Sequence, residues 1–116
     1  MLVVERFFQT DFVRPETEEN IEIFSIGDDG RNDFDGFCRL MLNELCYKPM
    51  FNALSLSGCE VEARVRERLD GVIEKRSVVE FSNCECGFLF NDDWNDILLA
   101  WRSNGRFWGF HWYTTA

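Results

Sequence analysis

The side chains of this chain that could hold a metal ion or act as a nucleophile are its thiols and its single histidine. A zinc site would draw on Cys59, Cys84, Cys86 and His111. Zinc ligands are commonly spaced C-x-x-C, which the C-x-C pair at 84 and 86 does not reproduce. A thiol nucleophile would need His111 beside it, but the cysteines have apolar or acidic neighbours, which do not activate a thiol. We therefore expect free, buried thiols, with no metal, no cofactor and no catalytic activity.

A run of oxygen-bearing side chains superficially resembles a calcium loop. Its members are Asp28, Asp29, Asn32, Asp33 and Asp35. They miss the EF-hand spacing, because no acid stands at the twelfth position and the glycines are misplaced. The sequence instead predicts a solvated turn in which Asn32 or Asp33 caps a following helix.

Negative charge is concentrated in the first third of the chain. Residues 1–36 hold ten acids and three bases, so they carry 3 − 10 = −7 of the formal net charge of −9. A field this one-sided repels nucleic acid and anionic membranes and attracts basic protein surfaces. The acids that we expect to contact such a partner are Glu16, Glu18, Glu19, Glu22, Asp28, Asp29, Asp33 and Asp35.

The aromatic stretch 92–113 is expected to dominate the core, since it holds every tryptophan and the only histidine. Asn104-Gly105 predicts a tight turn, followed by a strand over 106–113. On that strand, one face would carry Phe107, Gly109, His111 and Tyr113, and the other Trp108, Phe110 and Trp112. Two apolar faces predict an interior strand, or a strand whose second face becomes covered when a partner binds.

Residues 94–103 fit two structures. Trp94, Ile97, Leu98 and Trp101 have the i, i+3, i+4, i+7 spacing of a helix, which Asp92 would cap. Alternatively, residues 97–102 form the first strand of a hairpin that turns at 103–106. Both alternatives stay open at this point.

Two other segments predict helices. The first, from 34 to 45, has a continuous apolar stripe at Phe34, Phe37, Cys38, Met41 and Leu45, and Pro49 stops it. The second spans 59–70 and opens on the capping-box spacing of Ser57 and Glu60. A hairpin over this segment is disfavoured, because it would place Glu67 opposite Glu74.

Strands are predicted at 2–8, 21–26, 50–56, 77–82 and 86–90. The chain is therefore expected to be one α+β domain, residues 1–116, with a mainly antiparallel sheet and two to three helices packed on it. No apolar run approaches the roughly 20 residues of a membrane helix. The N-terminal segment lacks the basic start of a signal peptide, and we expect a cytoplasmic protein.

A small, acidic, aromatic-rich α+β chain of this kind resembles the immunity proteins of bacterial polymorphic toxin systems, including contact-dependent growth inhibition. The resemblance spans the whole chain and rests on the charge distribution and the block GRFWGFHWY at 105–113. No family site residues can be carried over. The resemblance implies a protein that binds a cognate toxin domain, often a basic nuclease, and blocks its active site or substrate groove.

Under this hypothesis the acids of the first third mimic substrate phosphates, and an exposed aromatic side chain anchors the contact. The partner is then a protein, not nucleic acid or a membrane, and the free chain is expected to be a monomer. Two alternatives share the same composition: a small acidic secretion chaperone, which would usually dimerise, and a phage-encoded inhibitor of a host enzyme.

Overall fold

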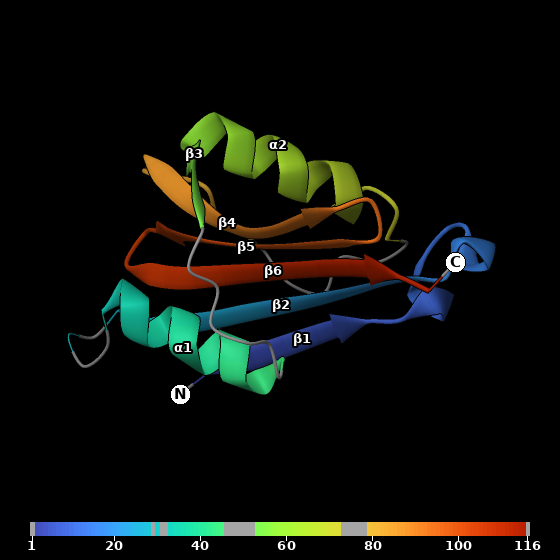
Figure 1. Cartoon of the computed structure of the whole chain (residues 1–116), viewed down its shortest axis with the longest axis horizontal. Helices are drawn as coiled ribbons and strands as arrows, with labels where there is room; N and C mark the ends of the chain where they lie inside the picture. The colour runs from blue at the N-terminus through green and yellow to red at the C-terminus, as the bar shows by residue number, and fades with distance from the viewer. Residues whose placement is uncertain (1, 29, 31–32, 46–52, 73–78, 116) are drawn as a thin grey trace.

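A six-stranded antiparallel sheet runs through the molecule, with strand order β1-β2-β6-β5-β4-β3 (Figure 1). The computed structural model describes residues 2–28, 30, 33–45, 53–72 and 79–115. The elements are β1 (Val3–Phe7), the 3-10 turns η1 (Gln9–Asp11) and η2 (Pro15–Thr17), β2 (Glu19–Gly27), α1 (Phe34–Glu44), β3 (Leu54–Ser57), α2 (Gly58–Leu69), β4 (Cys86–Asp93), β5 (Asp96–Ser103) and β6 (Arg106–Thr114). This confirms the predicted α+β class.

Strand β6 lies at the centre of the sheet, hydrogen-bonded to β2 on one side and to β5 on the other. Its predicted alternation is confirmed, because Trp108, Phe110 and Trp112 join one buried cluster while Phe107 joins the other. The turn before it uses Asn104 at φ 51° and Gly105 at φ 71°, the left-handed pair expected of a two-residue hairpin. β6 is therefore the interior strand that its two apolar faces indicated.

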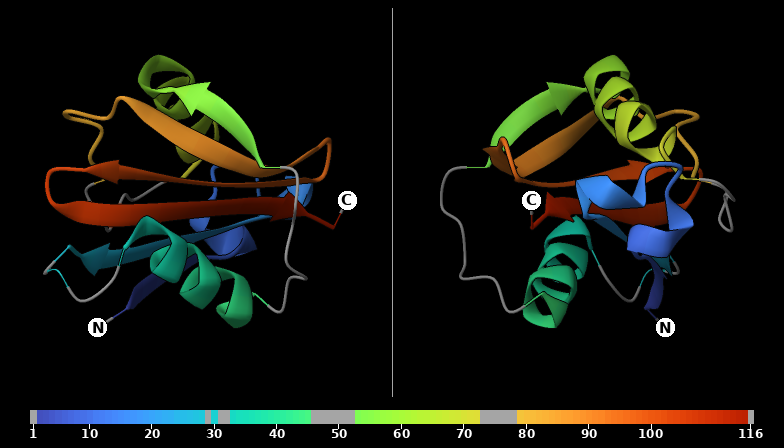
Figure 2. Two further views of the ribbon diagram at one scale, coloured as in Figure 1. Left: turned by 60° about the vertical axis from the view of Figure 1, so that its left-hand side comes forward. Right: turned by 90° about the vertical axis from the view of Figure 1, so that its right-hand side faces the viewer.

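The two helices cover opposite faces of the sheet (Figure 2). α2 packs Val61, Val65 and Leu69 into a cluster with Trp101 and other sheet residues. α1 packs Phe37, Cys38 and Met41 onto the other face. In the described part of the chain, no helix is long and apolar enough to cross a membrane.

Both predicted helix starts are confirmed. Asp33 caps α1 by accepting a 2.7 Å hydrogen bond from the Gly36 amide, while Asn32 lies outside the described residues. α2 begins with a complete capping box: the Glu60 amide donates to Ser57 Oγ at 3.2 Å, and the Ser57 amide donates to Glu60 Oε1 at 3.1 Å. The segment predicted as a helix at 59–70 is one, with observed bounds Gly58–Leu69 and Asp70 as its C-cap. The stop predicted at Pro49 for the other helix lies outside the described residues.

The helix alternative for 94–103 is wrong, and the hairpin alternative is right. Asp92 belongs to β4, a two-residue turn holds Trp94 and Asn95, and β5 runs from Asp96 to Ser103. Residues 97–101 are all buried, because β5 is covered on both faces. An apolar run buried on two faces satisfies helical spacing by coincidence.

The strand predicted at 77–82 is also not found: residues 79–82 lie outside any strand, and 77–78 lie outside the described residues. Their carbonyl groups accept from side chains instead, since Trp101 Nε1 donates to Glu80 O at 2.8 Å and Ser103 Oγ donates to Ser82 O. The strand predicted at 50–56 begins only at Leu54, and 50–52 lie outside the described residues.

Candidate partner-binding surface

The structure divides the acids predicted to bind a partner between the two ends of β2. Four of them lie at or near its start: Glu16, Glu18, Glu19 and Glu22. Three follow its end: Asp28, Asp33 and Asp35. Asp29 lies outside the described residues. A nine-residue strand is roughly 30 Å long at about 3.3 Å per residue, so one partner side chain cannot touch both groups.

Several of these carboxylates already bind groups of the chain itself. Glu19 accepts from Trp112 Nε1 at 2.9 Å and from Thr17 Oγ1 at 2.7 Å. Asp28 forms an ion pair with Arg102, and Asp33 caps α1. These acids have a structural role that their position in the sequence did not reveal.

Three acids that the sequence analysis did not assign to the partner lie beside the first group. Asp92, Asp93 and Asp96 flank the β4–β5 turn. The turn is joined to η2 through Thr114, whose amide donates to Asn95 O at 3.0 Å and whose hydroxyl donates to Thr17 O at 2.7 Å.

The neighbouring Thr115 hydroxyl donates to Glu18 Oε2 at 2.9 Å, which completes the connection. We call this surface the acidic end. It comprises Glu16, Glu18, Glu19, Glu22, Asp92, Asp93 and Asp96. In Figure 1 it lies on the right, where η1, η2, the β4–β5 turn and the C-terminus meet.

The acidic end also carries exposed apolar side chains. Trp94, at the tip of the β4–β5 turn, is 77% exposed, whereas Trp101, Trp108 and Trp112 are buried. Phe8 and Val13, on either side of η1, are 54% and 66% exposed. Protein interfaces are commonly anchored by an aromatic side chain within a polar rim, and Trp94 surrounded by carboxylates fits this description.

His111 lies on the sheet behind this surface, on the α1 side, and is buried. Its Nδ1 is 3.1 Å from Glu22 Oε1 and its Nε2 is 3.1 Å from Asp96 Oδ1. Burial lowers the pKa of His111, but the hydrogen bonds to Asp96 and Glu22 outweigh burial and raise that pKa above its usual 6.5. The bond from His111, with help from Arg6, lowers the pKa of Glu22 against the opposing effect of burial.

The structure does not bring Cys59, Cys84 or Cys86 together with His111. The expectation that these thiols are buried is wrong for Cys59 and Cys86, which are exposed. Cys84 packs against the α2-side cluster, on the other face of the sheet from His111. Burial, reinforced by Asp35, raises the pKa of the Cys38 thiol to about 12, and burial also raises that of Cys84. Among the described residues, no three His, Cys, Asp or Glu side chains converge in a way that could hold a metal ion.

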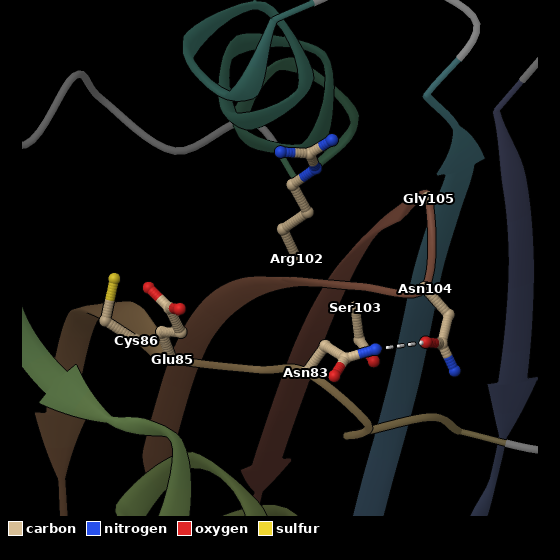
Figure 3. A pocket seen from close by; sticks show the side chains of 7 residues that line it. All are labelled: Asn83, Glu85, Cys86, Arg102, Ser103, Asn104 and Gly105. Carbon is tan, nitrogen blue, oxygen red and sulfur yellow. Dashed lines mark hydrogen bonds between the residues drawn. The ribbon is translucent and has the colours of Figure 1, made fainter.

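A cavity of about 480 Å³ opens at the opposite end of the sheet (Figure 3). It is lined by Asn83, Glu85, Cys86, Arg102, Ser103, Asn104 and Gly105. Its polar groups largely bind protein groups: Asn83 Nδ2 donates to Asn104 Oδ1 at 3.2 Å, and Arg102 pairs with Asp28. This lining has no arrangement of acid, base and nucleophile that would indicate a reaction.

No protein-family model, curated protein or solved structure matches this chain.

Proposed function

We propose that this protein is a stoichiometric inhibitor that binds a basic protein through its acidic end, in the manner of the immunity proteins of bacterial toxin systems. The observation that carries the proposal is the position of Trp94. It is the most exposed large apolar side chain of the described residues, and it stands between Asp93 and Asp96 on a turn whose Asn95 carbonyl accepts from Thr114, next to the Thr115 that bonds to Glu18.

The two features of this surface contribute to binding in different ways. Carboxylates facing a cationic groove accelerate encounter, and their effect falls as salt screens the charges. An aromatic side chain that becomes desolvated on docking supplies most of the affinity, because charged pairs at a rim contribute little. A basic nuclease groove, built to hold phosphates, is a complementary partner.

The remaining parts of the proposal follow from the same chemistry. The acidic end repels nucleic acid and anionic membranes, so the proposed ligand is a protein. The described cysteines are free, which fits a proposed cytoplasmic location, where thiols stay reduced. We propose that the free protein is a monomer without catalytic activity.

The proposal is tested by locating a toxin domain encoded next to the gene for this chain and expressing the two together. The wild-type chain should restore growth of the toxin-expressing cells and form a 1:1 complex with the domain on a sizing column. Charge reversal at the acidic end, Glu16→Lys with Asp93→Lys, should weaken protection. Continued growth arrest with well-expressed, folded wild-type chain would reject the proposal.

A matched control carries the same charge change at the opposite end. Asp35 and Glu85 are both exposed there, so Asp35→Lys with Glu85→Lys alters net charge equally. This control should protect cells as well as the wild type. Equal loss of protection in both double variants would mean that net charge, and not the acidic end, governs binding.

A further inference from the structure

The chain covers most of its indole rings with its own cations or aromatics. The guanidinium of Arg68 lies 4.1 Å from the Trp112 ring centroid, and that of Arg106 lies 5.8 Å from the Trp108 ring. Trp101 stacks with Phe81, at 5.2 Å between ring centroids, and with Trp108, at 6.2 Å. Arginine on an aromatic face is thus a recurrent contact of this fold.

Trp94 is the exception among the tryptophans. Its ring has no aromatic or cationic neighbour among the described residues, and 77% of the residue is exposed. Both faces of an indole carry partial negative charge, so an open ring in water favours a cation. The ring of Trp94 is therefore open to a cation from another molecule.

The carboxylates around Trp94 differ in what they already bind. Asp92 is paired with Arg64 at 2.9 Å, and Asp96 is bonded to His111. Asp93 is exposed and forms no ion pair with any described residue. Asp93 precedes Trp94 in the chain and its Cα pairs with that of Asp96 across the turn, so an exposed carboxylate without an ion-pair partner among the described residues belongs to the same turn as the open ring.

We propose that Trp94 and Asp93 together form a receptor for one arginine side chain of the partner protein. The identity of the partner rests on the function proposed above. The planar guanidinium stacks on the indole face and donates two hydrogen bonds to a carboxylate, which a lysine ammonium cannot do in the same geometry. Arginine, rather than lysine, is therefore the preferred ligand.

The receptor is tested without the toxin. Two Gly/Ser heptapeptides, one with two arginines and one with two lysines, are titrated into the ¹⁵N-labelled full chain while the Trp94 indole N–H signal is followed. The arginine peptide should shift this signal and bind several-fold more tightly than the lysine peptide, because only a guanidinium can stack on the indole and donate two parallel hydrogen bonds to the carboxylate. Equal affinities for the two peptides would overturn the proposal.

Three variants locate the site. Trp94→Leu keeps an apolar side chain but removes the ring, and Asp93→Asn removes the charge; each should abolish the preference for arginine. Asp35→Asn, at the other end of the sheet, should leave it unchanged. Retention of the arginine preference in Trp94→Leu would reject the receptor, as would its loss in Asp35→Asn. Because Trp94 is exposed, the leucine variant should keep the wild-type unfolding midpoint.

The outcome is separable from the inhibitor proposal. If the peptide preference depends on Trp94 but the toxin domain is not inhibited, the receptor stands and the inhibitor proposal fails. If Trp94→Leu inhibits the toxin as well as the wild type does, the chain is an inhibitor but Trp94 is not its anchor, and the receptor for an arginine of the partner is overturned.

Discussion

The Nε2 atom of His111 lies 3.1 Å from Oδ1 of Asp96, which ties the centre of β6 to the first residue of β5. The other ring nitrogen faces Glu22 of β2 at the same distance. A neutral imidazole carries one N–H and can donate to only one of these carboxylates. Both bonds are complete only in the imidazolium form, so the protonated ring holds three neighbouring strands together behind the Trp94 turn.

We predict that the stability from His111 is lost at alkaline pH. The pKa of His111 is raised on folding, so the contribution is full below pH 6.5 and is lost as pH rises through the folded pKa. His111→Gln should cost about 2 kcal/mol of unfolding free energy at pH 6, typical of hydrogen bonds to charged groups, and clearly less at pH 9. Urea unfolding at both pH values measures the difference.

The acid side of the profile provides the control. The pKa of Glu22 is lowered, so its contribution is present above pH 4.5 and is lost as pH falls through the folded pKa. The difference between wild type and His111→Gln should therefore shrink again on acidification. A difference that stays constant from pH 4 to pH 9 would contradict a charged histidine bridge.

Two glycines of the sheet should respond differently to alanine. A Cβ at Gly87 would meet the Ala100 carbonyl oxygen at 2.7 Å and Val61 Cγ2 at 2.6 Å, and the backbone of β5 cannot move aside. A Cβ at Gly109 would meet chiefly the flexible Met41 side chain. Gly87→Ala should cost about 3 kcal/mol and Gly109→Ala about 1 kcal/mol.

Denaturant unfolding with the second substitution Met41→Ala distinguishes the two mechanisms. Removal of the methionine side chain should remove the added cost of Gly109→Ala but leave that of Gly87→Ala unchanged. A larger cost at Gly109 than at Gly87 would contradict the close approach of α2 to the sheet.

The sequence specified most elements of the fold through local chemistry. The stripe from Phe34 to Met41, the capping box at Ser57 and the Asn104-Gly105 turn each depend on neighbours within a few residues. Residues 94–103 could not be decided in this way. Ile97 and Leu98 point to opposite faces of the sheet and both are buried. Their burial depends on the two helices that cover these faces. That information lies in distant segments.

The candidate site shows the same limit. Charge counted along the chain combined Glu16 with Asp35, although β2 separates them in space. It also missed Asp93 and Trp94, which reach the acidic end because β4 pairs with β5 and β5 pairs with β6. The sequence at 92–96 already shows one tryptophan next to three aspartates. That this tryptophan is exposed follows only when the segment forms a β-hairpin with Trp94 in its turn.

The capping box of α2 offers a further test of the fold. Ser57→Ala removes the acceptor for the Glu60 amide, which leaves a first-turn donor without its side-chain partner. We expect a loss of about 1 kcal/mol in thermal or chemical unfolding, while Ser57→Asp should retain most of the stability. An unchanged unfolding midpoint in the alanine variant would mean that water accepts the hydrogen bond of the Glu60 amide equally well.

The central claim, that one end of the sheet steers a basic partner, is tested most directly by stopped-flow association with the cognate toxin domain at increasing salt. The wild-type on-rate should fall steeply between about 50 mM and 500 mM salt, and Glu16→Lys with Asp93→Lys should lower it about tenfold at low salt and flatten its salt dependence. Asp35→Lys with Glu85→Lys should behave like the wild type. A wild-type on-rate that does not change with salt, or identical rates in the two double variants, would contradict the account.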